Sequence, residues 1–517
     1  MSDAFRESLR DPNGFTVSWE LVPGRGAREK DQEAVIKAAE AAAKGGKLHA
    51  LTITDNPGGT PAISPFYLGT EVKKLGIEPL VHFALKDKSR LMIETELYAM
   101  ARADINDLLV ITGDFPAGAF RGRSKPVFDL DPVQTIQLIK EMNAGLPVEG
   151  PKGMSALKAT DFVVGAAVSP FKQTEAELFG QYIKLEKKIK AGADFLVTQL
   201  GYDIRKFHEV LQYLRAVGLN VPVIASLYVL SYPVGRSMNA NQVPGCVVTD
   251  ELLKQLEAER EAADKGKGAR ILRAAKMYAM LKGMGYKGVH IGGYNLKYDE
   301  VEQVIVKGEE LVPNWQEYVR EFAFPQPGGF YMFERDAATG LNTAEFAPRN
   351  QTPGRKTFHG TTMRLLHHAM FDPKAPLFGA MKSLAKAIDG KALERPFSRM
   401  EHLVKLATND CMQCGDCALF DIAYICPMSQ CPKNQRNGAC GGSYNGWCEV
   451  YPNEKQCVWV RAYARLKAYN EEPQIDSYRL PPADWDLYQT SSWYNFYTGR
   501  DHSAAILGIP PVDKKKD

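Results

Sequence analysis

Eight of the nine cysteines lie within one short segment, from Cys411 to Cys457, and only Cys246 lies outside it. Thiols at this density form disulfides, bind metals or take part in redox chemistry. The N-terminal residues lack the apolar core of a signal peptide, so we expect a cytoplasmic protein whose thiols stay reduced. Metal ligation is therefore expected rather than a disulfide framework.

The cysteine spacing is compatible with two kinds of metal site. The run Cys411-x2-Cys414-x2-Cys417, followed by Cys426, is similar to the iron–sulfur run of bacterial ferredoxins, although its last spacer is longer. Cys-x2-Cys pairs also suit structural zinc, and no histidine lies within the segment to mix ligands. We favour [4Fe-4S] clusters, with zinc as the alternative. A second set of four ligands could come from Cys431, Cys440, Cys448 and Cys457.

Polar side chains also end several apolar runs in the first 310 residues. Glu20 and Asp114 are two carboxylates that would share one site if these runs are parallel strands of one barrel. Glu20 lies between Trp19 and Leu21, a dry setting that we expect to raise its pKa and suit it to general acid chemistry. Each such residue could alone be structural, so their joint position is the stronger signal. The others are Thr54, His82, Thr112 and Gln199.

The elements that must position these residues alternate regularly. Apolar runs typical of buried strands cover 15–21, 48–54, 78–85, 107–112, 162–168, 194–199, 221–227 and 288–292. Helical patterns follow them at 30–44, 64–75, 88–103, 132–143, 174–190, 204–217, 249–284 and 298–308. Eight strand–helix units within about 250–300 residues predict an α/β fold, a closed (β/α)8 TIM barrel, with a doubly wound open sheet as the alternative.

Composition places few further limits on the protein. The chain has 517 residues and a net charge of +3, with 24% charged residues, so we expect no nucleic-acid partner. No apolar stretch is long enough to predict a membrane span. We predict a barrel at 1–310, a connecting region at 311–398, a small cysteine-rich metal-binding domain at 399–475 and an aromatic tail at 476–517 that packs back on one of the domains.

Five segments of the predicted barrel resemble methylenetetrahydrofolate reductase, in the order of that family. They are Val17-Ser-Trp-Glu20-Leu-Val-Pro23, Leu51-Thr-Ile-Thr54, Val81-His82-Phe83, Leu109-Val-Ile-Thr-Gly-Asp114-Phe-Pro116 and Phe195-Leu-Val-Thr-Gln199-Leu-Gly-Tyr-Asp203. The resemblance covers roughly residues 10–310. The loop Asp55-Asn-Pro-Gly-Gly59 and the segment Gly292-Gly-Tyr-Asn295 differ from the usual sequence of the family. The choice between FAD and FMN, and the binding of a nicotinamide cofactor, therefore stay open.

The resemblance implies a reaction and a role for each matching residue. The reaction is the flavin-dependent reduction of 5,10-methylenetetrahydrofolate to 5-methyltetrahydrofolate, or the same reaction run backwards. Glu20 would protonate folate N10, and Asp114 would lie near the flavin and the pterin. Gln199 and Tyr232 would contact the substrate. The flavin-binding residues would be Thr54, His82, Thr112, Asp114 and Lys188.

The cysteine-rich segment resembles a second module. Asn437-Gly-Ala-Cys440-Gly-Gly442 and Gly446-Trp-Cys448-Glu-Val450 look like the C-terminal domain of methylenetetrahydrofolate reductase, a separate small subunit in acetogenic bacteria. The implied role is electron transfer to the flavin, with NAD(P)H, ferredoxin or an electron-donating subunit as the source. No GxGxxG follows a predicted strand, so we expect no separate NAD(P)H domain. The alternative function is a folate- or methyltransferase-binding protein without reductase activity and with a structural zinc domain. A homo-oligomer stays possible.

Overall fold

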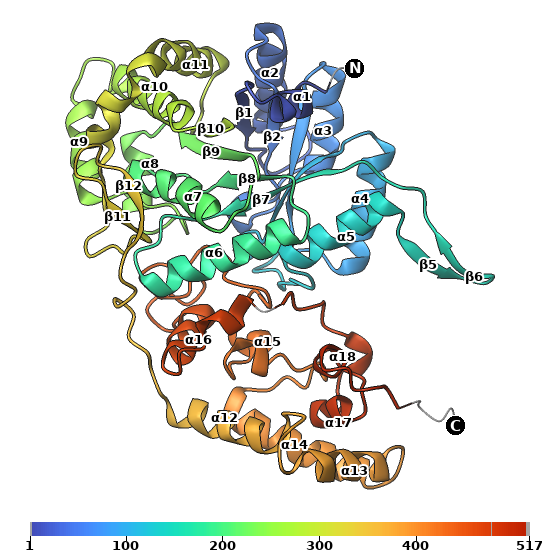
Figure 1. The fold of residues 1–517 in the computed structure, drawn as a ribbon. Helices are drawn as coiled ribbons and strands as arrows, with labels where there is room; N and C mark the ends of the chain where they lie inside the picture. The colour runs from blue at the N-terminus through green and yellow to red at the C-terminus, as the bar shows by residue number, and fades with distance from the viewer. Residues whose placement is uncertain (1–2, 477, 513–517) are drawn as a thin grey trace.

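A computed structural model describes residues 3–476 and 478–512. Its first part is a closed barrel of parallel strands in the order β1-β10-β9-β8-β7-β4-β3-β2, which confirms the (β/α)8 fold (Figure 1). The strands are β1 (Thr16–Leu21), β2 (Ala50–Ile53), β3 (Glu78–Ala84), β4 (Asp107–Ile111), β7 (Val163–Val168), β8 (Phe195–Thr198), β9 (Val223–Tyr228) and β10 (Gly288–Gly292).

The helices that cover the barrel follow the predicted order. They are α2 (Lys30–Gly45), α3 (Pro65–Lys74), α4 (Arg90–Arg102), α5 (Pro132–Ala144), α6 (Glu175–Lys190), α7 (Ile204–Ala216), α10 (Lys267–Gly283) and α11 (Tyr298–Leu311). A capping box at the start of α6, in which Thr174 and Glu177 satisfy each other's backbone N–H groups, explains why that helix begins there.

The structure corrects the prediction of one long helix over 249–284. Three helices follow β9: α8 (Tyr232–Asn239), α9 (Asp250–Arg260) and α10. The interruption occurs where Lys265 and Gly266 adopt positive φ angles of 54° and 76°. A left-handed backbone ends a helix, and glycine adopts it without steric cost.

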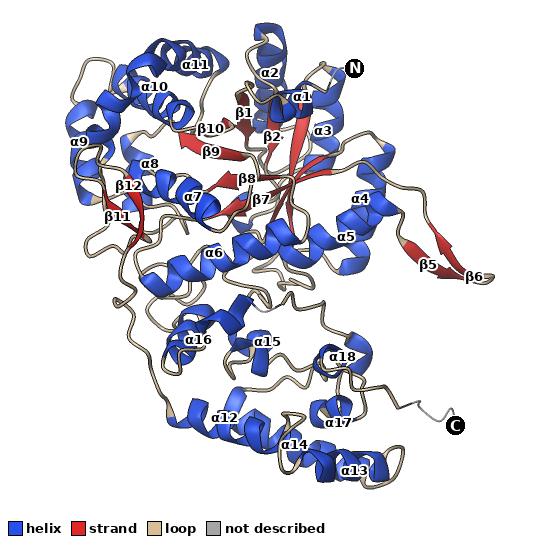
Figure 2. Cartoon of the chain, viewed as in Figure 1, coloured by secondary structure: helices blue, strands red, loops and turns tan. Residues whose placement is uncertain are grey.

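Two small elements were not predicted. The N-terminal helix α1 (Ala4–Arg10) closes the end of the barrel where the strands begin: Phe5 packs on Phe195, and the Arg6 Nε lies 2.8 Å from Asp107 Oδ1. A hairpin of β5 (Pro147–Gly150) and β6 (Gly153–Ala156) projects from the edge of the molecule (Figure 2). The opposite end of the barrel, where the strands finish, stays available for a site.

Residues that follow the barrel continue to pack on it. The turn-rich segment η2 (Val312–Phe322) and the hairpin of β11 (Phe333–Arg335) and β12 (Asn342–Phe346) contribute Val319, Phe322 and Phe333 to the barrel's hydrophobic core. The boundaries predicted at 310, 398 and 475 stay predictions.

The C-terminal region is built from short helices and loops (Figure 2). It comprises α12 (Phe358–Met370), α13 (Phe378–Ile388), α14 (Glu394–Asn409), η3 (Phe420–Ile422), α15 (Pro427–Gln430), α16 (Val458–Lys467), η4 (Glu472–Asp476), η5 (Trp485–Leu487), α17 (Ser492–Tyr497) and α18 (His502–Ile506). Helix α16 contacts α6, whereas α12, α13 and α14 lie along the edge farthest from the barrel (Figure 1).

The aromatic tail packs back on this region, as predicted. Tyr494, Phe496 and Tyr497 of α17 form a hydrophobic cluster with Ala385 and Ile388 of α13. Within the described residues, we find no helix whose length and hydropathy would suit a membrane crossing.

Candidate active site and cysteine groups

A cavity of about 310 Å³ lies at the ends of the barrel strands, where the fold predicts a site. Its wall combines strand-end side chains with a loop from the cysteine-rich region. Of the residues predicted from the sequence, the cavity brings together Glu20, Thr54, His82, Thr112, Asp114, Lys188 and Gln199.

Glu20 forms a hydrogen-bonded chain with two residues that were not predicted. The His290 Nε2 lies 3.4 Å from Glu20 Oε2, and the His290 Nδ1 lies 3.2 Å from Ser18 Oγ. The barrel creates this contact because β1 pairs with β10, which places Ser18 directly opposite His290. In such a pair, the imidazole can orient the carboxyl and exchange a proton with it.

The expected rise in the pKa of Glu20 is wrong. Burial favours the neutral acid, but the hydrogen bond and the electrostatic interaction with His290 outweigh it and lower the pKa of Glu20. The apolar neighbours Trp19 and Leu21 point into the packed barrel wall and do not determine the electrostatics of the carboxyl.

Three buried polar atoms of this cavity have no hydrogen-bond partner among the residues that the structure describes. They are Thr54 Oγ1, His82 Nε2 and Ser169 Oγ. Burial lowers the pKa of His82 to about 4, so its imidazole is neutral and can either donate or accept a hydrogen bond. Buried polar groups in proteins are almost always satisfied, so these atoms fit a polar ligand such as an isoalloxazine or a pterin.

Asp114 faces the same cavity from the loop after β4. Its Oδ2 accepts a hydrogen bond of 2.8 Å from the backbone N–H of Gly58. Gly58 has a φ of 63°, a conformation that favours glycine and explains the Gly pair in the loop after β2. The two loops thus hold the Asp114 carboxylate at the rim.

Lys188 and Gln199 complete the barrel side of the cavity. Lys188 donates to the Ala167 carbonyl at 2.5 Å, and burial together with the nearby Lys184 lowers its pKa to about 7. A lysine with such a pKa can gain or lose its proton near neutral pH. Gln199 accepts a hydrogen bond from the Leu200 backbone N–H, which orients its amide.

Tyr232 is not brought to this site. Its hydroxyl lies 3.3 Å from Glu257 Oε1, and Arg260 stacks over its ring. Tyr228, at the end of β9, lines the cavity instead. The sequence contains a signal that favours Tyr228, because a residue at the end of a strand faces the barrel mouth more directly than the first residue of the next helix. The substrate role of Tyr232 stays a prediction.

The cysteine-rich region forms a roof over the cavity with Lys433, Cys440, Gly441, Gly442 and Glu449. The Lys433 Nζ lies 2.5 Å from Glu449 Oε1 and donates to the Gly113 carbonyl at 2.8 Å. The Cys440 thiol donates to the same Glu449 oxygen at 3.2 Å. A Cβ at Gly442 would overlap the Glu449 carboxylate, which explains the Cys-Gly-Gly motif.

Barrel lysines fasten the roof from below. Lys172 donates to the Ser443 carbonyl at 2.7 Å and Lys184 to Gln435 Oε1 at 2.6 Å. Both lysines are almost fully buried, so these bonds satisfy charges that would otherwise be costly to bury.

The eight clustered cysteines are free thiols in two groups. The first group lines one small pocket beside α14 and consists of Cys411, Cys414, Cys417 and Cys426. In the second group, burial raises the pKa of Cys457 to about 12, and the neighbouring Cys431 and Cys448 add to the effect. Burial and the neighbouring Glu449 raise the pKa of Cys440, and Cys457 and Cys431 add to the effect. The second group therefore consists of Cys431, Cys440, Cys448 and Cys457.

The sulfur atoms do not form a preformed metal site of three close ligands within the described residues. Within the described part of the chain, no three cysteine sulfurs lie within 4.8 Å of one another. A tetrahedral zinc with bonds of about 2.3 Å would hold them roughly 3.8 Å apart. The choice between an iron–sulfur cluster and zinc stays a prediction.

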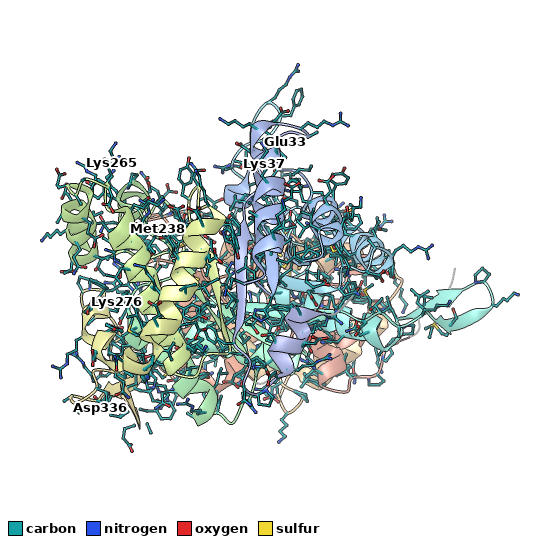
Figure 3. All side chains as sticks on the ribbon, turned by 90° about the horizontal axis from the view of Figure 1, so that it is seen from above. Glu33, Lys37, Met238, Lys265, Lys276 and Asp336 are labelled. Carbon is teal, nitrogen blue, oxygen red and sulfur yellow. The ribbon has the colours of Figure 1, made fainter. Side chains whose placement is uncertain are left out.

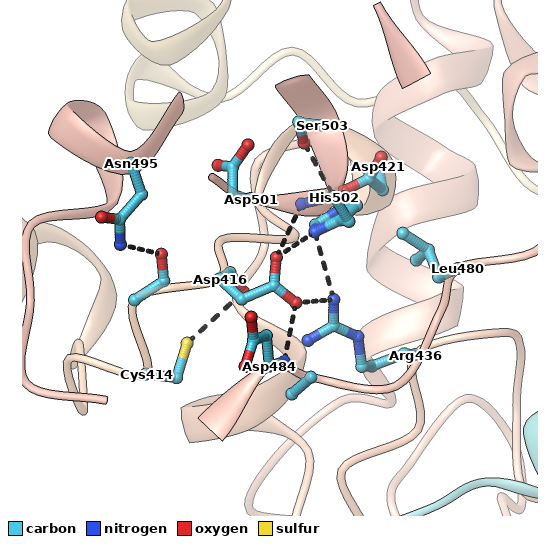
Figure 4. Close-up of polar contacts among 12 residues, drawn as sticks. Cys414, Asp416, Asp421, Arg436, Leu480, Asp484, Asn495, Asp501, His502 and Ser503 are labelled. Atoms are coloured by element: carbon cyan, nitrogen blue, oxygen red, sulfur yellow. Dashed lines mark hydrogen bonds and ion pairs between the residues drawn. The ribbon is translucent and has the colours of Figure 1, made fainter. Parts of the chain in front are cut away.

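A buried polar network holds the loop of the first group (Figure 4). Arg436 donates to Asp416 Oδ2 at 3.0 Å, His502 is hydrogen-bonded to Asp416 Oδ1, and Asn495 donates to the Gly415 carbonyl. Burial opposes ionisation of Asp416, but His502 and Arg436 keep its pKa below the usual range. The C-terminal tail is thereby tied to the turn between Cys414 and Cys417.

Comparison with known proteins gives two family matches. Residues 5–308 match the family described as "Methylenetetrahydrofolate reductase", and residues 391–486 match "Methylene-tetrahydrofolate reductase C terminal". The chain belongs to the methylenetetrahydrofolate reductase family. The cavity with Glu20 therefore lies in the reductase-type barrel, and both cysteine groups lie in the part that matches the C-terminal family.

Individual relatives are more distant. "Methylenetetrahydrofolate reductase 2" of Saccharomyces cerevisiae is 26% identical over 185 residues, which cover 34% of this chain and 28% of the yeast protein. An uncharacterized protein from Clostridium thermocellum that binds two copies of 5-methyl-5,6,7,8-tetrahydrofolic acid is 13% identical over 60% of this chain and 99% of its own, with a TM-score of 0.41. A 2,3-dimethylmalate lyase is 12% identical over 63% and 88%, with a TM-score of 0.33.

Proposed function

We propose that this chain catalyses the flavin-dependent reduction of 5,10-methylenetetrahydrofolate to 5-methyltetrahydrofolate, with electrons supplied through its two cysteine groups. The observation that carries the proposal is one cavity shared by three parts. These are the Glu20–His290 pair, the unpaired polar atoms at Thr54, His82 and Ser169, and the Cys440 side of the second cysteine group.

The unpaired atoms support a flavin at this site, as either FAD or FMN. Thr54, His82, Thr112, Asp114 and Lys188 would hold it. When bound, a flavin supplies the hydride that the methylene carbon receives. Lys188 can carry a positive charge or lose it near pH 7, so it can balance the charge of a bound ring system.

Glu20 and His290 would supply the proton of the reaction. The bond between folate N10 and the methylene carbon breaks, N10 takes a proton, and the carbon takes a hydride, for a total of two electrons and two protons. The Nε2 of His290 faces the Glu20 carboxyl, so His290 would relay a proton to Glu20, and the carboxyl would pass it to N10. The lowered pKa of Glu20 makes His290 a necessary part of this step, because an isolated carboxylate of low pKa stores no proton at neutral pH.

The position of Cys440 supports the electron route. Its thiol lines the cavity, while the first cysteine group lies beside α14 on the outer side of the domain (Figure 1). [4Fe-4S] clusters at the two groups would form a path from the surface to the cavity. A protein donor, ferredoxin or a partner subunit, fits this path better than NAD(P)H, which would need direct access to the flavin.

Anaerobic purification followed by metal, sulfide and flavin analysis tests the proposal. We expect about eight iron and eight labile sulfide atoms and one flavin per chain. Reduced benzyl viologen should then drive formation of 5-methyltetrahydrofolate. Zinc without sulfide would remove the electron path, and failure to turn over with a bound flavin would contradict the reductase function.

A further inference from the structure

Helix α14 is amphipathic, but its polar side is buried and its apolar side is exposed. Its buried residues are all polar: Glu401, Lys405 and Asn409. Its exposed residues include Met400, Leu403 and Val404, with exposed fractions of 46%, 64% and 43%. A helix of a protein that acts alone turns its apolar side to the core, so the outer face of α14 has the pattern of a surface that another molecule covers.

The exposed apolar residues form a regular stripe. Met400, Leu403, Val404 and Ala407 are exposed and follow the spacing i, i+3, i+4, i+7, which places them on one side of the helix. Met412, 41% exposed, continues the apolar surface next to Cys411. These five residues are called the α14 face below.

The exposed charged residues of α13, of α14 and of the segment between them are basic. They are Lys386, Lys391, Arg395 and Arg399. The acidic residues of the same stretch are engaged elsewhere. Asp389 pairs with Arg500, Glu394 accepts the Gly390 N–H, and Glu401 accepts hydrogen bonds from Ser491 and Ser492. Asp410, between α14 and Met412, is also exposed, so the charge beside the face is predominantly basic. An apolar centre with a predominantly basic rim complements an acidic partner.

The buried side of the same helix lies against the first cysteine group. Lys405 donates to the Cys417 sulfur at 3.4 Å and to Ser492 Oγ at 2.6 Å. Glu401, Lys405 and Asn409 all line the pocket that holds Cys411, Cys414, Cys417 and Cys426. A molecule on the outer face is therefore separated from these thiols by one helix diameter, about 10 Å.

We propose that the α14 face is the docking surface for an acidic electron-transfer protein of the ferredoxin type, which delivers single electrons to the first cysteine group. The inference rests on the proposed function, and it adds where the donor binds and what charge it carries. Two such deliveries supply the two electrons that each methylene reduction consumes. The roof over the barrel lies at the other side of the domain, so donor and folate do not compete for one surface (Figure 1).

The test measures binding directly, with the anaerobically prepared full chain and a purified bacterial 2[4Fe-4S] ferredoxin. Calorimetric titration gives the Kd of the wild type, of Arg395→Glu/Arg399→Glu, and of Met400→Gln/Leu403→Gln. The matched control is Lys37→Glu/Lys44→Glu, because both lysines are exposed on α2 of the barrel (Figure 3 labels Lys37). Circular dichroism and iron content verify that each variant is folded and loaded.

We expect both α14 variants to raise the Kd at least about tenfold, while the α2 control stays within about twofold of the wild type. Higher salt should weaken wild-type binding and have less effect on the Arg395→Glu/Arg399→Glu variant. Benzyl viologen, which needs no docking surface, should drive all variants equally. Loss of viologen-driven turnover in the wild type would contradict the proposed function and not the docking site.

Two results would overturn the docking proposal. One is an unchanged ferredoxin Kd in both α14 variants. The other is a wild-type dimer in light scattering that Met400→Gln/Leu403→Gln converts to a monomer without weakening ferredoxin binding, since the face would then join two copies of this chain.

Discussion

Replacing His502 with Gln should destabilise the loop of the first cysteine group in a pH-dependent way. His502 and Asp416 are 8% and 1% exposed, and they form one of the most buried ion pairs of the C-terminal region. Burial alone would lower the pKa of His502, but hydrogen bonds to Asp416 and Asp421 raise it to about 9. Gln keeps the size and a hydrogen-bond donor but cannot carry the charge.

The magnitude follows from the pKa difference between the folded and unfolded chains. A rise from about 6.5 to about 9 corresponds to roughly 3 kcal/mol at low pH, where both states are protonated, and to somewhat less at pH 7. Because the folded pKa is the higher one, this stabilisation is complete below about pH 6 and disappears as the pH rises through about 9. His502→Gln should therefore lose most stability in acid and approach the wild type near pH 10.

Pulse proteolysis in urea at pH 6, 7, 8 and 9 measures the effect on the C-terminal region separately from the barrel. The control is His368→Gln, which removes an exposed histidine on α12 of the same domain. A His502→Gln variant that is equally destabilised at all four pH values would refute the electrostatic reasoning and leave only a packing effect. A variant as stable as the wild type at pH 6 would show that the His502–Asp416 pair does not stabilise the loop.

Three further predictions concern the chemistry. Glu20→Gln should bind flavin normally, by absorbance titration, yet lose viologen-driven methylene reduction by about 10²–10⁴-fold; near-normal turnover would exclude a proton-donor role. His290→Leu removes the hydrogen bond and the electrostatic interaction that lower the pKa of Glu20 while its burial remains, so the limb of the pH–rate profile that belongs to Glu20 should move to higher pH; an unmoved limb would show that His290 does not set the pKa of Glu20. Cys440→Ser should remove about half of the bound iron and slow flavin reduction by ferredoxin, whereas Cys246→Ser, outside both groups, should keep the full iron content.

Much of the barrel could be predicted from the sequence because each strand is a local apolar run and each helix a local periodic pattern. Strand-end residues such as Thr54 and Gln199 could be placed at one rim because parallel strands all finish at the same end. The division of the cysteines into two groups also follows their order along the chain.

Contacts between distant segments could not be predicted in the same way. His290 is 270 residues from Glu20, and the two meet only because the barrel closes with β10 beside β1. That contact reverses the expected shift in the pKa of Glu20. The roof residues Lys433 and Glu449 are a further example, since their role appears only when the C-terminal region covers the barrel mouth. The break at Gly266, in contrast, had a local signal in the sequence Lys265-Gly-Lys-Gly268.

The roof over the barrel has a consequence for how the protein matures. The loop that carries Cys431 and Cys440 also supplies Lys433 and Gly441 to the cavity wall, so one stretch of backbone serves both the second cysteine group and the cavity. Metal binding gathers its ligands into one arrangement, so a metal at the second cysteine group would also fix the loop that forms the roof. We therefore expect assembly in a fixed order in the cell, with metal insertion first and stable cofactor retention second.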